Sequence, residues 1–376
     1  MEKSALVYVF LTLITVFLGL FVNREAEVTA YLKPGGRVTP VGCSNRRQAR
    51  NAVAEFAVFA LLTGVSACRI AVGNDYWVYR FNFNLIAQER HVSYESGFNV
   101  IVKWIQNLFG YDAYLPVFAF FSFVTVLFFT LALRDQAEHY AFSLFLLMTG
   151  GYYFNSLNSV RYYLALAIAL FSMKYVIRRE YLKFVVIILV GTMFHKSILL
   201  VIPVYLAAGW LSRIRLKAWH LGLGALLAAS LLFGQNLYRE IIFFFYPYYR
   251  GSAFDNGELS FINLAKCAAT LVLCAICYKK SLKGNTVYRF YFFLNAAGFL
   301  VYCCSFIPEV SRVGYYMIIS QIFLLPGLIA DMEEGWLKKL CYVGVIGAFT
   351  LYFGVLLHKM YAVDVRLLPY LNWIFN

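Results

Sequence analysis

Charged residues are scarce in this chain, and no long polar stretch separates its apolar segments. Asp, Glu, Lys and Arg make up 14% of the 376 residues, and 62% are hydrophobic. Soluble domains carry about 25% charged and about 45–50% apolar residues. No soluble domain, repeat or low-complexity tract is present. This composition excludes an ordinary soluble protein and predicts an all-α polytopic membrane protein, with a single transmembrane domain over residues 1–376.

Acidic residues are rarer than basic ones, so the formal net charge is +14. In a soluble protein this excess would suggest nucleic acid as a partner. Here the basic residues lie in short loops between apolar runs, where they act as orientation signals, and no nucleic acid is expected. The eight cysteines follow no ligand pattern, since the C-x-x-C at Cys274 and Cys277 has no histidine or second pair nearby. We therefore expect no metal and no cofactor.

Long apolar runs dominate the rest of the sequence. A membrane-spanning helix needs about 20 apolar residues, or fewer where the protein buries its ends. On this rule we expect about twelve transmembrane helices: Ser4–Val22, Val53–Cys68, Ala113–Leu133, His139–Phe154, Val160–Val176, Leu182–Phe194, Ser197–Trp210, Trp219–Phe233, Ile262–Tyr278, Phe290–Phe306, Val313–Ala330 and Leu340–Leu357.

The distribution of Lys and Arg predicts the orientation of these helices. The richest loop, Asn23–Asn51, holds six basic residues, and four later clusters fall on the same side if the crossings alternate. Placing these loops in the cytoplasm puts both termini outside. Tyr181–Gly209 could be one tilted helix, but that would move the basic segment after Leu211 to the wrong side. We therefore predict two short helices that turn at His195 and Lys196, on the extracytoplasmic side.

Two extracytoplasmic segments are long enough to be structured. The segment 69–112 contains Phe98–Phe109, whose apolar positions are spaced as in an amphipathic helix lying in the membrane interface. The segment 234–261 combines aromatic and charged residues and is expected to form a lid-like loop.

Three arginines begin or end predicted helices at one membrane level: Arg69, Arg161 and Arg312. Guanidinium groups bind phosphate oxygens bidentately and stay charged, so a lipid-linked diphosphate at the membrane surface is the expected ligand. The alternative is that each arginine extends to lipid headgroups or pairs with a nearby acid, for example Asp75 with Arg69. Asn155 and Asn158 precede Arg161 at spacings of three, which would put all three on one helix face if the helix begins that early.

Other residues at this level are suited to proton transfer and sugar binding. His195, Asp75 and Glu95 are three candidates for the general base, and the sequence does not choose among them. Tyrosines can stack on sugar rings. The candidate sugar-binding residues are Tyr76, Tyr79, Asn158 and Tyr315.

The order of these residues resembles the EpsG-like family of Wzy-type polysaccharide polymerases. The resemblance is strong from about Cys68 to Tyr205 and extends to Pro326. It is carried by Arg69, Gly73-Asn74-Asp75-Tyr76, Tyr79, Tyr94-Glu95-Ser96-Gly97-Phe98, Asn158-Ser159-Val160-Arg161, Phe194-His195-Lys196-Ser197, Arg312 and Tyr315. The family commonly has Gly-Thr-Asp where this chain has Gly73-Asn74-Asp75, and Arg-Gln where it has Arg161-Tyr162.

The resemblance implies a metal-independent membrane glycosyltransferase that polymerises polyprenyl-diphosphate-linked oligosaccharide repeats into exopolysaccharide, capsule or O-antigen. It further implies the bacterial inner membrane, an extracytoplasmic active site, membrane lipids as partners and a chain-length regulator as a candidate partner. Two alternatives stay open. One is a GT-C-type glycosyltransferase that uses a polyprenyl-phosphate sugar with Asp75 as base. The other is a non-enzymatic transporter or flippase of lipid-linked glycans, which predicts midplane charges and an internal repeat.

Overall fold

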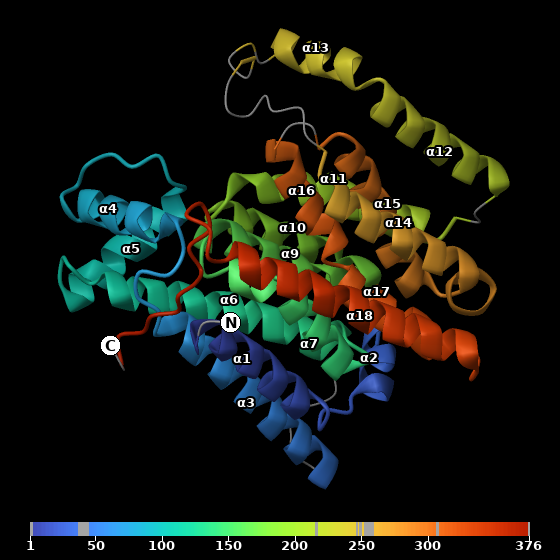
Figure 1. Ribbon diagram of the computed structural model, residues 1–376, viewed down its shortest axis with the longest axis horizontal. Coiled ribbons are helices and arrows are strands. Elements are labelled where there is room, and N and C mark those ends of the chain that lie inside the picture. The colour runs from blue at the N-terminus through green and yellow to red at the C-terminus, as the bar shows by residue number, and fades with distance from the viewer. Residues whose placement is uncertain are drawn as a thin grey trace. The chain divides into compact units, whose positions relative to one another are not determined.

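A computed structural model describes residues 3–36, 45–214, 217–245, 247, 250–251, 259–305 and 308–374. These residues form helices and no strand, apart from one isolated bridge between Arg69 and Asn372. The contacts divide the chain into two compact units, residues 1–199 with 333–376 and residues 200–332. Figure 1 shows the helices of both units, coloured along the chain. The all-α prediction is confirmed.

Unit 1 contains the first ten helices, a short 3-10 helix and the last helix. They are α1 (Lys3–Gly19), α2 (Glu25–Leu32), α3 (Arg46–Ala67), α4 (Asp75–Ala87), α5 (Ser96–Phe109), α6 (Tyr114–Gln136), α7 (Tyr140–Thr149), α8 (Tyr152–Asn155), α9 (Val160–Ile177), α10 (Tyr181–Thr192), η1 (Lys196–Leu200), whose last residue belongs to unit 2, and α18 (Trp336–Lys359).

Helix α9 is the core of unit 1. All of its 18 residues except Arg161 and Tyr175 are buried. It packs against α6 and α10, and α6 in turn packs against α3, α5 and α2. A helix that is apolar all round must be enclosed by other helices. Because α9 is enclosed, Arg161 in its first turn is held at a defined position at one end of the bundle.

Unit 2 is built around α15 (Thr286–Cys303). Helices α11 (Val201–Leu211), α12 (Ala218–Phe233), α14 (Phe261–Ile276), α16 (Pro308–Ile318) and α17 (Gln321–Ala330) all pack against it. Inside this unit the Gln321 Nε2 donates to Asn295 Oδ1 at 2.7 Å, and the Asn295 Nδ2 donates to the Cys267 carbonyl at 3.1 Å. Buried amides in apolar helices need such partners, so this chain of bonds fixes three helices against each other.

Among the described residues, four helical segments have the length and composition of membrane spans: Tyr114–Gln136, Val160–Ile177, Trp336–Lys359, and Arg312–Ala330, which runs from α16 into α17. Six shorter apolar helices lie at other expected crossings in the same described part of the chain. Apolar helices of this kind make the chain an integral membrane protein. The number of twelve crossings and the side each loop faces remain predictions.

Several expected helices are interrupted. The run His139–Phe154 forms α7 and α8, which are separated by Gly151 with φ +81°. Glycine adopts this left-handed conformation without a Cβ clash, so the chain can leave the helix there. The break at His195 was predicted and is confirmed, since α10 ends at Thr192 and η1 begins at Lys196.

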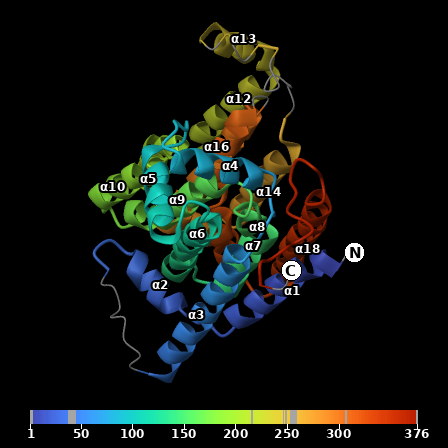
Figure 2. The same ribbon diagram turned by 90° about the vertical axis from the view of Figure 1, so that its left-hand side faces the viewer.

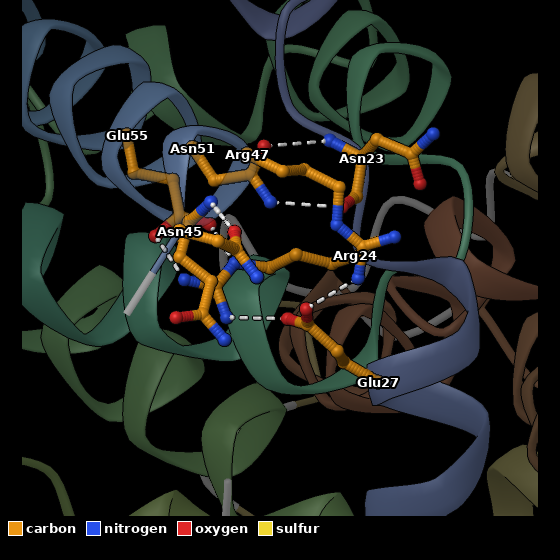
Figure 3. A network of polar contacts seen from close by, with 8 residues as sticks. Asn23, Arg24, Glu27, Asn45, Arg47, Asn51 and Glu55 are labelled. Carbon is orange, nitrogen blue, oxygen red and sulfur yellow. Dashed lines mark hydrogen bonds and ion pairs between the residues drawn. The ribbon is translucent and has the colours of Figure 1, made fainter. Parts of the chain in front are cut away.

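The connection between α1 and α2 is tied to α3 by a network of polar contacts (Figure 3). The buried Asn51 side chain accepts from the Asn23 backbone N–H at 3.1 Å and donates to the Asn23 carbonyl at 2.8 Å. Arg24 beside it pairs with Glu55 and Glu27. This network lies at the end of unit 1 opposite α4 and α5, as Figures 1 and 2 show.

We predict that Asn51→Ala lowers the stability of the purified protein. The change leaves the Asn23 N–H and carbonyl without their partner, and an unpaired buried backbone group costs about 1–3 kcal/mol. Thermal unfolding in detergent measures this loss. Asn107→Ala, at an exposed position of α5, is the matched control and should leave the melting temperature unchanged. An Asn51→Ala variant that melts with the wild type would contradict the role of this network.

Candidate active site

The segment between α3 and α6 begins with a helix that the sequence reading did not identify. Helix α4 (Asp75–Ala87) buries Tyr76, Tyr79, Phe83 and Ile86. Their spacings of three, four and three are helical, so the periodicity of this segment could have revealed the helix. The helix expected over Phe98–Phe109 is present as α5 and begins two residues earlier, at Ser96.

Asp75 sits at the first turn of α4, directly against the first turn of α9. Its backbone N–H donates to Asn158 Oδ1 at 2.9 Å, and its carboxylate Oδ2 accepts from Ser159 Oγ at 2.9 Å. Gly73 makes this approach possible. A Cβ added at Gly73 would lie 2.9 Å from the Asn158 Cα, and the backbone φ there is +95°.

Glu95 immediately precedes α5 and pairs with Arg161 at the start of α9. The other Glu95 oxygen, Oε1, accepts from the Lys196 backbone N–H at 3.1 Å. The guanidinium carbon of Arg161 lies 3.8 Å from the centre of the Tyr94 ring, in a cation–π contact. One fifth of the Arg161 side chain remains exposed. Arg161 is thus held in one orientation without being sealed from a ligand.

The Arg161 guanidinium keeps donors to spare. Its Nη1 serves Glu95, whereas its Nε is buried and has no hydrogen-bond partner among the described residues. Arginine has five N–H donors in a planar fork, and a buried donor without a partner is costly.

The turn after α10 brings His195 to the same site. The His195 ring lies 5.5 Å from that of Tyr162, measured between centroids, and its Nδ1 is 2.8 Å from Ser197 Oγ. The turn is anchored to α5, because the Phe98 backbone N–H donates to the Met193 carbonyl at 3.1 Å.

Three helix N-termini therefore meet at one point of unit 1, those of α4, α5 and α9. Helix N-termini carry partial positive charge and unpaired N–H groups, so they attract anions. Two carboxylates, Asp75 and Glu95, already lie at these termini, and Arg161 adds a full positive charge. Together with the His195 turn, this arrangement brings four separate sequence motifs into one polar cluster.

The model of the EpsG family matches residues 54–372 of the chain. The protein belongs to the EpsG family. The resemblance inferred from the motifs is confirmed, and this membership indicates a membrane protein of the polysaccharide-polymerase type. No curated protein and no solved structure matches the chain.

In this EpsG-family protein, the C-terminal segment after α18 holds the loop that leads to Asp75. The Gly73 N–H donates to the Arg366 carbonyl at 2.7 Å, the Asn74 N–H to the Val365 carbonyl at 3.0 Å, and the Ile70 N–H to the Leu371 carbonyl at 3.0 Å. These are backbone contacts, which any side chain allows, so no sequence signal could have revealed them.

Arg69 lies deep in unit 1, and only 1% of it is exposed. Its Nη1 donates to the Ser66 carbonyl at 2.5 Å and to Ser122 Oγ at 2.7 Å, and its guanidinium lies over the Phe118 ring. The suggested pairing with Asp75 is not found, because Asp75 bonds Ser159 instead. We therefore assign Arg69 to holding α3 against α6.

The candidate sugar-binding tyrosines of α4 are also enclosed. Tyr76 is 1% exposed and stacks on Phe118, with ring centroids 4.6 Å apart. Tyr79 accepts from the Arg161 backbone N–H, and burial raises the pKa of its phenol to about 12, so it is neutral at physiological pH. Tyr76 thus positions α4 against α6, and Tyr79 positions α4 against α9, as Asn158 does through Asp75.

The remaining candidates lie in other places. Asn155 ends α8 and the helix of Arg161 begins only at Val160, so the expected single face of Asn155, Asn158 and Arg161 is wrong. Arg312 and Tyr315 are on α16 in unit 2, where Arg312 is exposed. The expected lid-like segment 234–261 contains helix α13 (Gln235–Phe245). Residues 246, 248–249 and 252–258 of this segment lie outside the described residues.

We predict that Gly73→Ala impairs both stability and polymer formation. Its Cβ would push the Asn158 backbone away from Asp75, in addition to the cost of about 1–2 kcal/mol for a left-handed alanine. Gly110→Ala is the matched control, since φ there is +100° and nothing lies within 4 Å of the added Cβ. Polymer length on gels and melting temperature are the measurements. Equal loss of polymer in the two variants would contradict the close approach as the cause.

Proposed function

We propose that the protein is a glycosyltransferase that polymerises polyprenyl-diphosphate-linked oligosaccharide repeats into exopolysaccharide, capsule or O-antigen. The observation that carries this proposal is Arg161. It stands where three helix N-termini meet, is oriented by Glu95, and keeps one fifth of its side chain exposed. A diphosphate can bind this exposed part of the side chain, and family membership supports a lipid-linked glycan as its carrier.

In the proposed reaction, an acceptor sugar hydroxyl attacks the anomeric carbon of the donor glycan. The bond between that carbon and the diphosphate oxygen breaks, and the polyprenyl diphosphate leaves with the bonding electrons. Negative charge therefore grows on the diphosphate, where Arg161 can offset it in a site partly removed from water. Arg312 is proposed as a second diphosphate ligand because of its place among the family motifs. The proton of the acceptor hydroxyl passes to a general base.

Asp75 is the strongest of the three base candidates. One of its oxygens accepts from Ser159, which orients the carboxylate, and no contact of the described residues occupies the other. Both oxygens of Glu95 are engaged, by Arg161 and by the Lys196 N–H. Glu95 is therefore proposed as a positioning residue for Arg161. His195 lies at the same site and is proposed to contact phosphate or the acceptor sugar.

We predict that Arg161→Ala abolishes long polymer, with a loss of at least about 100-fold in rate, as expected when a charge-stabilising donor is removed. The change also removes the partner of Glu95 and should lower the melting temperature, so rates are compared at equal membrane levels of folded protein. Arg90→Ala is the matched control, since Arg90 is exposed between α4 and α5. Polymer of wild-type length from Arg161→Ala would refute the assignment.

We predict different effects for the two acids. Asp75→Asn removes the proton acceptor and should lower the rate by about 10²–10⁴-fold with both lipid-linked substrates saturating. Glu95→Gln replaces the ion pair that orients Arg161 by a weaker neutral hydrogen bond. It should therefore mainly raise the KM for the diphosphate donor. Polymerisation assays with a purified donor separate the two. Full activity of Asp75→Asn would exclude it as base, and turnover of a monophosphate-linked single sugar would instead favour a GT-C-type enzyme.

A further inference from the structure

Unit 1 contains a second polar site, at the end opposite Arg161. It is a cavity of about 290 Å³ whose polar walls are formed by Arg24, Glu27, Tyr31, Arg134, Asp135 and Lys174. Lys174 lies thirteen residues after Arg161 on the continuous helix α9. At 1.5 Å per residue this places the cavity about 20 Å from the candidate active site. The two sites therefore cannot share one small ligand.

Each carboxylate at this cavity already has a cationic partner. Glu27 pairs with Arg24 and with Arg47, whose Nη2 is 2.7 Å from Glu27 Oε1. Asp135 pairs with Lys174, and Glu55 behind the wall pairs with Arg24 (Figure 3). Glu55 also attracts Arg134 electrostatically, but both of its oxygens are bonded to Arg24.

Arg134 is that further charge. It lines the cavity from the last turn of α6 and makes no side-chain hydrogen bond or ion pair within the part of the chain that the structure describes. The cavity lining itself holds three cations, Arg24, Arg134 and Lys174, and two carboxylates, Glu27 and Asp135, which leaves one positive charge uncompensated. In a membrane protein such a charge is costly unless a partner supplies the missing anion.

The opposite wall is rigid and also cationic. The Lys174 side chain is only 5% exposed, and its Nζ lies 3.6 Å from the centre of the Phe171 ring. An ammonium fixed in this way can face a ligand without rearrangement. Helix α2, which supplies Glu27 and Tyr31, packs on α6 and lies within the Asn23–Asn51 loop. Loop charge predicts that this loop is cytoplasmic, where anionic phospholipids provide phosphate groups.

We propose that this cavity binds a singly charged phosphate group, with Arg134 as its main ligand and Lys174 as a second positive group. The chemistry fits the phosphodiester of an anionic phospholipid headgroup and equally a free phosphate ion. The volume is close to the lower limit of small-molecule sites, which suits a headgroup and excludes a large soluble ligand. This proposal is independent of the polymerase assignment.

The test measures the melting temperature of the full-length protein in detergent with added phosphatidylglycerol, compared with neutral phosphatidylcholine. Ligand binding to the folded state should raise the melting temperature of the wild type by about 3–6 °C with phosphatidylglycerol only. Arg134→Gln should lose at least half of this difference, and Arg134→Lys should keep most of it. Arg47→Gln is the matched control, since Arg47 holds the same Glu27 from outside the cavity.

Sodium phosphate against sodium chloride at equal ionic strength distinguishes the two sources. A shift with phosphate alone identifies the free ion, and a shift with phosphatidylglycerol alone identifies the lipid headgroup. If Arg134→Gln does not fold, Leu131→Phe narrows the cavity without changing its charge and should remove the shift. An equal response of wild type and Arg134→Gln, or an equal loss in Arg47→Gln, would overturn the proposal.

Discussion

The ion pair between Arg161 and Glu95 joins the start of the buried helix α9 to the start of helix α5. Without Glu95, the arginine would stand at the N-terminus of α9, where the helix dipole repels positive charge. With it, a guanidinium is held at a point where three helix N-termini already favour anions. The Glu95 carboxylate orients the Arg161 guanidinium and offsets its repulsion by the helix dipole.

The surrounding structure supports this pair from several sides. Gly73 lets α4 approach α9 closely enough for Asp75 to bond Ser159, and the C-terminal segment holds the loop before it through backbone contacts. Buried aromatic side chains, among them Tyr76 and Tyr79, fill the space beneath. A site whose supporting groups are buried and bonded needs little rearrangement when a charged substrate arrives.

Unit 1 places charged groups at both ends of the same helix. Arg161 begins α9, and Lys174 lies in its last turns. At the first end the acid Glu95 leaves Arg161 with donors to spare, and at the second Asp135 and Glu27 are satisfied while Arg134 is not. The second end thus carries one positive charge more than its lining carboxylates, whereas at the first end Arg161 stands with Glu95 and Asp75 at three helix N-termini. The helix between them is apolar and enclosed, as a membrane-spanning core requires.

The all-α membrane class, most helix positions, the break at His195 and the family could be predicted from the amino-acid sequence, because apolar periodicity, helix ends and short motifs are local properties. The same local patterns pointed to Asp75, Glu95, Arg161 and His195, which the structure brings into one cluster. The roles of these residues depend on tertiary packing. Arg69 bonds Ser122 because α6 packs beside the end of α3, and Glu95 is bound to Arg161 because α9 begins beside α5. No local sequence pattern encodes which helices become neighbours.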